Sequence, residues 1–93
     1  MSRPLHLVCY DVRCPKRWRR IFALLKRRGA HRQLSVFLLR LDQPAIQKLR
    51  MDLSLLINPA EDSVLIVKIE GKTEGLTELG LPGPMPGARI IVV

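Results

Sequence analysis

The hydrophobic and polar positions of this chain alternate between strand-like and helix-like patterns. A nearly unbroken apolar run covers Leu5 to Val12, which is typical of a strand buried on both faces. Between Lys16 and Arg28 the apolar residues recur at i, i+3, i+4 and i+7, which predicts an amphipathic helix. Pro15 suits the first turn of that helix, and Gly29 suits its C-terminal stop.

The middle of the chain repeats this alternation. The segment from His31 to Leu41 is predicted to be a second strand. Asp42 followed by Pro44 is typical of a helix start, because the first can cap the helix and the second fits its first turn. Apolar residues at helical spacing follow, and Asn58-Pro59 ends this second helix.

The last third of the chain contains two predicted strands separated by a Gly/Pro-rich stretch. Ser63–Ile69 is the third strand, and Ala88–Val93 is a terminal strand. Between them, Glu70–Gly87 is rich in Gly and Pro, and its part Gly80–Gly87 cannot form regular structure. We therefore expect a domain over residues 1–78. Residues 79–93 are expected to form a linker and a strand that is docked on, or exchanged with, another protomer.

The predicted element order indicates the fold class. The predicted order is strand, helix, strand, helix, strand, strand. It becomes the ferredoxin-like β-α-β-β-α-β arrangement if one short strand splits off the second strand, and we place that split within Leu38–Leu41. The prediction is an α+β, ferredoxin-like sandwich with an extra C-terminal strand. A chain of 93 residues has little room for a concave site, so we expect it to be dimeric.

Charge is distributed unevenly along the chain. Residues 1–41 hold eleven Lys and Arg and one Asp, whereas residues 42–93 hold five Lys and Arg and seven Asp and Glu. Such a one-ended positive field favours a polyanionic partner, most often nucleic acid. The sequence has no long apolar span of the kind that would indicate a membrane-bound protein. It also has no signal-peptide apolar region, which predicts a cytoplasmic protein.

The first predicted helix carries most of this positive charge. It contains no Asp or Glu, although a solvated helix face usually mixes both signs. A solvated face is the alternative interpretation, but phosphate contact explains the pattern better. The basic residues of this helix are Lys16, Arg17, Arg19, Arg20, Lys26, Arg27 and Arg28.

Asp11 is the one candidate for metal chemistry. It is the only acidic residue among the first forty-one, and it ends an apolar strand just before the basic helix. Capping or pairing with a nearby Arg is the structural alternative. One carboxylate holds Mg²⁺ poorly, but a two-fold dimer with Asp11 near its axis would bring two together around Mg²⁺ or Mn²⁺. The remaining acidic residues of the first two thirds are predicted to lie on helix starts, helix faces or turns: Asp42, Asp52, Glu61 and Asp62.

Four short motifs in a fixed order resemble one known family. They are Tyr10-Asp11-Val12, a basic helix ending at Gly29, Gln33-Leu34-Ser35-Val36-Phe37 and Asp62-Ser63-Val64. Together they resemble the CRISPR-associated protein two family over residues 5–69. The C-terminal Ile90-Ile91-Val92-Val93 is similar to the last strand of that family.

The resemblance implies a ferredoxin-like homodimer that takes part in acquiring new spacers. It implies a CRISPR-associated integrase as partner, duplex DNA as cargo, and metal-dependent endonuclease activity on DNA or single-stranded RNA in some members. Asp11 matches the metal-binding position, and Tyr10, Arg20 and Phe37 match positions tied to that site. Further basic positions follow by local equivalence: Arg17, Arg19 and Arg32.

One departure from the family pattern affects the expected activity. Family members commonly place acidic or hydroxyl residues after the Tyr-Asp pair, where this chain has Arg13-Cys14-Pro15. A basic loop binds phosphate well but offers a metal fewer oxygen ligands. We therefore expect nucleic-acid binding to be favoured over strong nuclease activity.

The sequence leaves the enzyme question open. Two alternatives to an adaptation subunit are a stand-alone, toxin-like ribonuclease and a basic nucleic-acid-binding module without chemistry. The candidate catalytic residues are Asp11, Tyr10 and Phe37, with Mg²⁺ or Mn²⁺ at Asp11. The candidate nucleic-acid-binding residues are Arg13, Lys16, Arg17, Arg19, Arg20, Arg27 and Arg32.

Overall fold

A computed structural model describes residues 3–70, 77–79 and 91–92 of the chain. The elements follow the ferredoxin-like order β-α-β-β-α-β, with two further short strands, which confirms the predicted fold class. They are β1 (Leu5–Asp11), α1 (Pro15–Lys26), β2 (Ala30–Gln33), β3 (Val36–Arg40), α2 (Gln43–Leu56), β4 (Ser63–Ile69), β5 (Thr77–Glu78) and β6 (Ile91–Val92).

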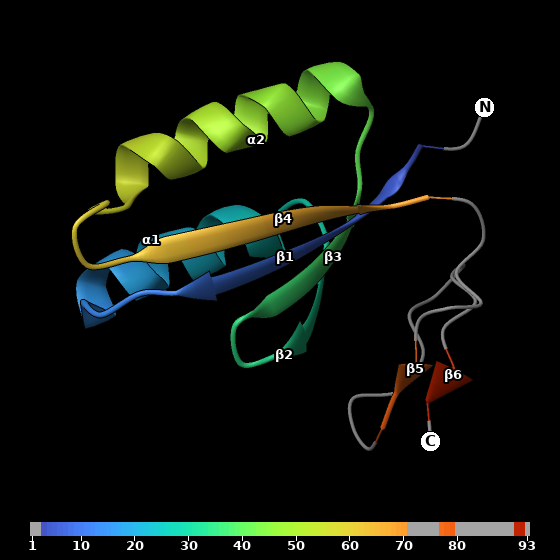
Figure 1. The fold of residues 1–93 in the computed structure, drawn as a ribbon, viewed down its shortest axis with the longest axis horizontal. Helices are drawn as coiled ribbons and strands as arrows, with labels where there is room; N and C mark the ends of the chain where they lie inside the picture. The colour runs from blue at the N-terminus through green and yellow to red at the C-terminus, as the bar shows by residue number, and fades with distance from the viewer. Residues whose placement is uncertain (1–2, 71–76, 80–90, 93) are drawn as a thin grey trace.

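The main sheet has four antiparallel strands in the order β2-β3-β1-β4. β1 runs through its middle, where Val8 lies opposite Phe37 of β3 on one side and Ile66 of β4 on the other. Figure 1 shows β1, β3 and β4 side by side, with α1 behind them. The strand that ends in Asp11 is therefore held by ladder hydrogen bonds along both of its edges.

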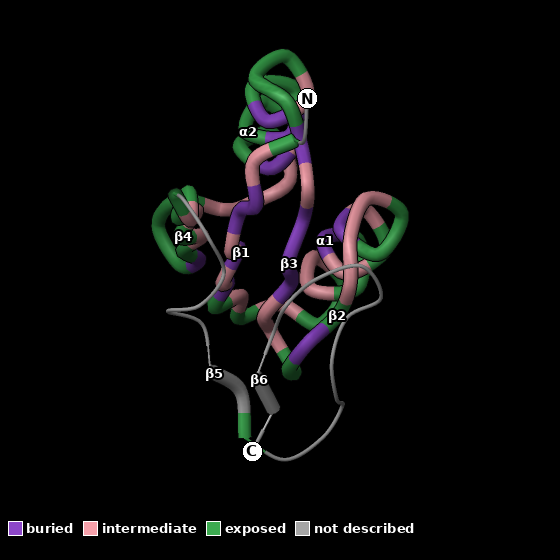
Figure 2. The backbone as a smooth tube through the Cα atoms, turned by 90° about the vertical axis from the view of Figure 1, so that its right-hand side faces the viewer, coloured by how far each residue is buried: buried purple, intermediate pink, exposed green. Residues whose placement is uncertain are grey.

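Both helices bury their apolar stripes against the same face of the sheet. Because side chains alternate along a strand, Val8 and Tyr10 of β1 share this face with Phe37 and Leu39 of β3. The buried positions of Figure 2 follow these strands and the inner sides of the helices. The helix residues that complete the core are Ile21, Leu25, Ile46, Leu49 and Leu53.

The opposite face of the sheet is only partly covered. On this open face, Leu65 and Val67 of β4 are 60% and 40% exposed, and Leu7 and Cys9 of β1 are half-buried. The prediction that β1 is buried on both faces is therefore confirmed only in part, because on this face Leu5 is buried but Leu7 and Cys9 are half-buried. The apolar run in its sequence reflects a core on one side and a partly covered apolar surface on the other.

The predicted split of the second strand occurs earlier than expected. The chain turns at Leu34-Ser35, between β2 and β3, and not within Leu38–Leu41. Leu34 is 76% exposed at this turn, and the carbonyl of Ser35 accepts a hydrogen bond of 3.1 Å from the N–H of Tyr10. This turn could not be predicted from the sequence pattern, because Leu34-Ser35 is not an Asn-Gly or other glycine-containing pair, which most two-residue hairpin turns use.

The second helix begins where the sequence predicts. The side chain of Asp42 accepts a hydrogen bond of 3.0 Å from the backbone N–H of Ala45, which is the capping contact expected of an aspartate at this position. Pro44 lies in the first turn. The helix ends at Leu56, just before Asn58-Pro59.

Near the C-terminus, β5 pairs in parallel with β6 in a separate two-stranded sheet. This pairing was not predicted, because β5 lies within the Gly/Pro-rich stretch. β6 falls inside the predicted terminal strand, of which residues 88–90 and 93 lie outside the described part of the chain. The division into residues 1–78 and 79–93, and the exchange of the last strand between protomers, stay predictions.

Candidate nucleic-acid interface

Asp11 lies at the exposed end of β1, on the open face of the sheet. It is paired in register with Ser63 of β4, and alternation along β1 places it on the same face as Leu7 and Cys9. Its side chain is 71% exposed, and its Oδ2 atom lies 3.9 Å from Nη2 of the equally exposed Arg13. Such a solvent-exposed pair contributes little to stability, so the carboxylate stays accessible to a ligand.

Tyr10 and Phe37 lie on the other face of the sheet, inside the core. Phe37 is fully buried and Tyr10 is 5% exposed, with 6.3 Å between their ring centroids. The hydroxyl of Tyr10 has no hydrogen-bond partner among the described residues, and burial raises its pKa to about 12. The structure thus places both residues beneath Asp11 as packing, and their catalytic roles stay predictions.

All four aromatic residues of the chain take part in this packing. Trp18 and Phe22 of α1 stack at 5.1 Å, and Phe22 meets Phe37 edge-to-face at 5.5 Å. Tyr10 lies 6.2 Å from Trp18, while Nε1 of Trp18 donates a 3.4 Å hydrogen bond to Oγ of Ser35. Aromatic pairs of this kind stabilise the contact between helix and sheet, and they keep these rings out of a base-stacking surface.

A buried carboxylate that the sequence assigned only to a turn organises this end of the molecule. The side chain of Asp62 is fully buried. It accepts hydrogen bonds from the backbone N–H groups of Arg13 at 3.0 Å and Asn58 at 2.9 Å. It also accepts from Nε and Nη2 of Arg17 at 2.7 and 3.1 Å. One carboxylate therefore ties together the β1–α1 loop, α1 and the α2–β4 loop.

The ionisation of Asp62 is fixed by these donors. The Arg17 guanidinium beside it, helped by the backbone N–H groups of Asn58 and Arg13, holds the pKa of this carboxyl well below its usual range. The same contact raises the pKa of Arg17, whose Nη2 also donates to Glu61 at 3.0 Å. This network holds the backbone of Arg13 two residues after Asp11, so it fixes the loop that carries the acidic strand end.

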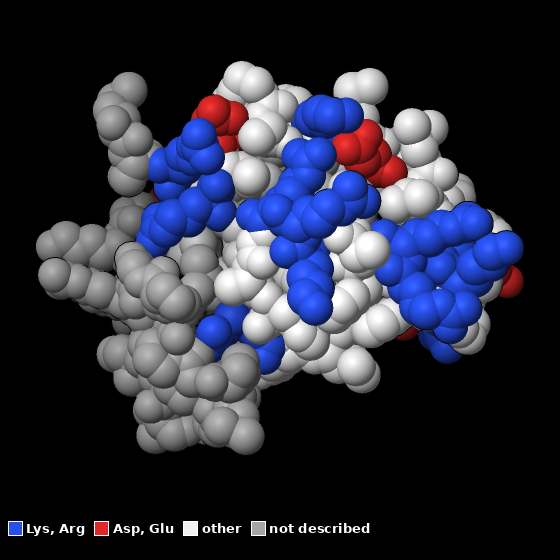
Figure 3. Space-filling view, turned by 180° about the vertical axis from the view of Figure 1, so that it is seen from behind, with Lys and Arg blue, Asp and Glu red and all other residues white. Residues whose placement is uncertain are grey.

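The predicted nucleic-acid-binding residues divide into exposed and internally engaged groups. Arg17 is engaged by Asp62 and Glu61, and Arg32 is buried on β2. Figure 3 shows the Lys and Arg side chains in several groups across one face of the molecule, with few Asp and Glu between them. The exposed members of the predicted set are Arg13, Lys16, Arg19, Arg20 and Arg27.

The site residues of one protomer do not form a complete metal centre. Among residues 3–70, 77–79 and 91–92, no three His, Cys, Asp or Glu side chains are grouped to hold an ion. Among these residues Asp11 offers one exposed carboxylate. Within the same residues, no helix is both long enough and apolar enough to cross a membrane.

The fold and the site define a class of protein. The chain is a small ferredoxin-like α+β protein with a basic helix beside an exposed strand-end aspartate, a fold that several families with different functions share. Residues 4–75 match the family model of CRISPR associated protein Cas2. The chain belongs to the Cas2 family.

Relatives and solved structures agree with this assignment. The chain is 43% identical over 65 residues to the CRISPR-associated endoribonuclease Cas2 of Geobacter sulfurreducens, covering 70% of this chain and 68% of that protein. It is 33% identical over 93 residues to the CRISPR-associated endonuclease Cas2 2 of Thermus thermophilus, covering 100% and 99% of the two chains.

Two crystal structures share the fold. A hypothetical protein of Thermus thermophilus superposes with a TM-score of 0.77 at 34% identity, over 92% of this chain and 99% of that one. Cas2 of Streptococcus pyogenes superposes with a TM-score of 0.64 at 28% identity, over 68% and 82% of the two chains.

Proposed function

We propose that this chain is a homodimeric, nucleic-acid-binding subunit of CRISPR adaptation that hydrolyses phosphodiester bonds with a divalent metal ion held by paired Asp11 carboxylates. The observation that carries the proposal is the position of Asp11, exposed at the end of a partly uncovered apolar sheet face. Relatives that are named endoribonuclease and endonuclease support the chemistry. The dimer, the metal ion and the nucleic acid are supported by separate features of the protomer.

The open face of the sheet supports the dimer. Leu65 and Val67 are 60% and 40% exposed there, and a sheet face of this kind gains stability when it is buried against another layer. A second copy offers the same face, so a two-fold axis through it would cover both. Asp11 lies at the end of β1 on that face, so an axis that passes near this end would bring it toward Asp11 of the partner subunit.

The same symmetry would complete the metal site. Mg²⁺ prefers oxygen ligands in octahedral geometry and keeps several waters, so two facing carboxylates and water are a suitable set. A bound ion of this kind activates water and neutralises the charge that develops on the phosphate. In its absence the facing carboxylates repel each other, so the dimer itself favours a cation at this position. Arg13, beside Asp11, is placed to contact a nearby phosphate.

The exposed basic residues of α1 support contact with the nucleic-acid backbone. Lys16 and Arg19 are exposed, and α1 has no acidic residue in its first turn. Tyr10 and Phe37 are buried in the core, and Trp18 and Phe22 are half-buried against it, so no aromatic side chain stands fully exposed for single-stranded bases to stack on. Binding through phosphates therefore favours duplex DNA over single-stranded RNA.

The test compares cleavage by the native protein and by Asp11→Asn. Labelled duplex DNA and single-stranded RNA are incubated with Mg²⁺, with Mn²⁺ and with a chelator, and light scattering checks the dimer in every sample. Glu70→Gln is the matched control, because Glu70 has an exposed carboxylate beside Lys68 on the chain segment that follows β4.

Metal-dependent cleavage that falls at least 100-fold in dimeric Asp11→Asn and persists in Glu70→Gln is the expected result. Equal cleavage by the native protein and Asp11→Asn would refute the metal role of Asp11. Cleavage of RNA alone, without stable co-purification of a CRISPR-associated integrase, would favour the toxin-like ribonuclease. Duplex binding without cleavage would leave the non-catalytic DNA-holding subunit.

A further inference from the structure

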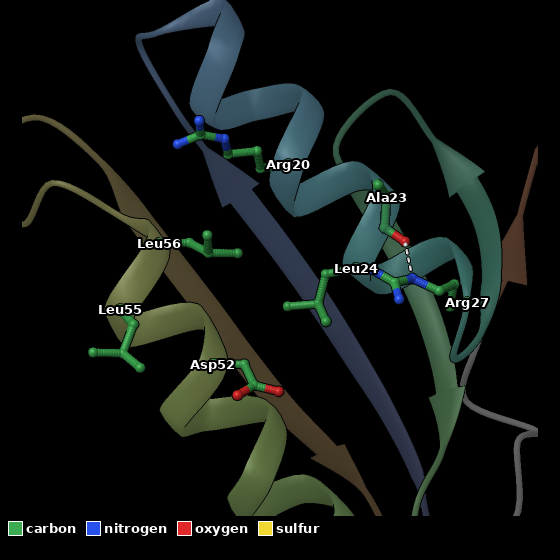
Figure 4. Close-up of a pocket in the computed structure, with 7 residues that line it drawn as sticks. All are labelled: Arg20, Ala23, Leu24, Arg27, Asp52, Leu55 and Leu56. Atoms are coloured by element: carbon green, nitrogen blue, oxygen red, sulfur yellow. Dashed lines mark hydrogen bonds between the residues drawn. The ribbon is translucent and has the colours of Figure 1, made fainter.

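A groove runs between α1 and α2 on the side of the helices that faces away from the sheet. Its volume is about 470 Å³. Figure 4 shows Leu24 of α1 and Leu56 of α2 extending into the space between the two helices, with Ala23 beside Leu24. The residues that line it are Arg20, Ala23, Leu24, Arg27, Asp52, Leu55 and Leu56.

The apolar lining of the groove extends beyond the core of the protomer, because Leu24 and Leu56 pack against the core whereas Leu55 does not. α2 already buries Ile46, Leu49 and Leu53 against the sheet. Leu55 is nevertheless 83% exposed, two positions after the last buried leucine and at the rim of the groove. A single exposed leucine is ordinary, but one that continues an apolar lining between two helices is typical of a binding surface.

The charged part of the groove has a positive surplus. Asp52 is neutralised by Arg28 at 3.6 Å and by Lys48 at 3.4 Å. Arg20 and Arg27 have no carboxylate within 4.0 Å in the part of the chain that the structure describes, and Nε of Arg27 donates only to the Ala23 carbonyl of its own helix. Two unneutralised arginines therefore flank an apolar floor.

We propose that this groove binds an amphipathic acidic helix of a partner protein, with leucine-like side chains on the floor and Glu or Asp beside Arg20 and Arg27. Helices lie in apolar grooves through residues at i, i+3 or i+4, and i+7. Arg20 and Arg27 are seven positions apart, which is about 10 Å along α1 at about 1.5 Å per residue, or two turns of a docked helix. Carboxylates at matching spacing would pair with both arginines.

Other occupants fit the groove less well. A nucleic-acid backbone gains contacts with the arginines but leaves Leu55 and Leu56 against charged phosphates. A second copy of this chain would bring four unneutralised arginines together around one groove, and like charges at close range repel. A helix that is both acidic and apolar complements both components of the surface.

The test uses three fluorescently labelled helical peptides of equal length and the full-length protein. The first carries leucines at i, i+3 and i+7 with flanking glutamates, the second replaces the glutamates by lysines, and the third replaces the leucines by serines. Leu55→Ser removes the groove leucine. Met51→Ser is the matched control, because Met51 is 66% exposed on the same helix but does not line the groove.

The acidic leucine peptide is expected to bind the native protein and Met51→Ser with equal affinity. Its affinity for Leu55→Ser should be roughly ten-fold lower, as expected from the loss of one buried leucine side chain. Failure of this peptide to bind more tightly than the other two would overturn the proposal. Weaker duplex DNA binding by Leu55→Ser would assign the groove to the nucleic-acid interface. Loss of self-association in Leu55→Ser would assign it to a second copy.

Discussion

Replacing Gly29 by alanine tests how tightly the end of α1 is packed against the sheet. The sequence predicts Gly29 as a helix stop, a position that often needs the left-handed backbone conformation. The backbone of Gly29 is not left-handed, and its N–H donates to the Leu25 carbonyl at 3.0 Å. The glycine is needed for space, because a Cβ atom there would clash with the Leu38 carbonyl oxygen and would lie 2.6 Å from Cγ of Leu39.

Two effects of Gly29→Ala have opposite signs. Alanine restricts the unfolded chain, which stabilises the protein by about 0.4–1 kcal/mol where the native conformation is compatible. Overpacking costs about 1–3 kcal/mol. The second effect dominates here, because the closest atom belongs to the backbone of β3, which is paired with β1 at Leu7 and Leu38 and cannot move freely.

The net expectation is a destabilisation of roughly 1.5 kcal/mol, which corresponds to a fall in Tm of roughly 6–12 °C for a domain of this size. Thermal and denaturant unfolding monitored by circular dichroism measure it. Ser54→Ala is the control, since Ser54 is exposed on α2 and its replacement should change the free energy of unfolding by at most about 0.5 kcal/mol.

Gly29→Ser should destabilise at least as much as Gly29→Ala, because it adds the same Cβ atom and an oxygen. An unchanged or higher Tm for Gly29→Ala would refute the reasoning. That result would mean that β3 yields to the new methyl group at little cost. The close contact between Gly29 and β3 would then not limit the packing of the molecule.

The charged and buried groups give three further predictions. The pKa of Asp62 is depressed in the folded state, so this carboxylate stabilises the fold above its unfolded pKa near 3.8 and loses that contribution as the pH falls below it. Acid unfolding of Asp62→Asn should therefore lack this part of the transition. An acid-unfolding profile equal to that of the native protein would contradict the stabilising role of the hydrogen bonds to Asp62. Desolvation by burial lowers the pKa of His6, so stability should decline as the pH falls below about 6.5, and His6→Leu should reduce the difference in Tm between pH 7 and pH 5.5. Arg19→Ala should reduce the slope of log binding constant against log salt concentration for duplex DNA by about 0.9 for each phosphate that the variant no longer neutralises. Arg17→Ala should instead lower Tm and leave this slope nearly unchanged, because Arg17 is paired with Asp62. A larger slope change for Arg17 than for Arg19 would show that the ion pair with Asp62 opens when nucleic acid binds.

Local chemistry explains which elements were predictable from the sequence. The cap at Asp42 and the periodicity of α2 act within a few residues of each other, so the helix was predicted near its observed bounds. The turn at Leu34-Ser35 was missed because it contains no glycine or Asn-Gly pair, so that pairing across the sheet and not residue type decides the break.

The sequence by itself determined the α+β order, the basic character of α1 and the exceptional position of Asp11 at the end of an apolar strand. Only the tertiary structure decided which charges are accessible, because Asp62 and Arg17 are 45 positions apart and meet through the folding of β4 beside β1. It also placed Tyr10 and Phe37 inside the core and Asp11 outside, since neighbouring residues of a strand face opposite sides of the sheet. Long-range contacts of this kind are set by packing of the whole chain, and a local pattern of residues cannot specify them.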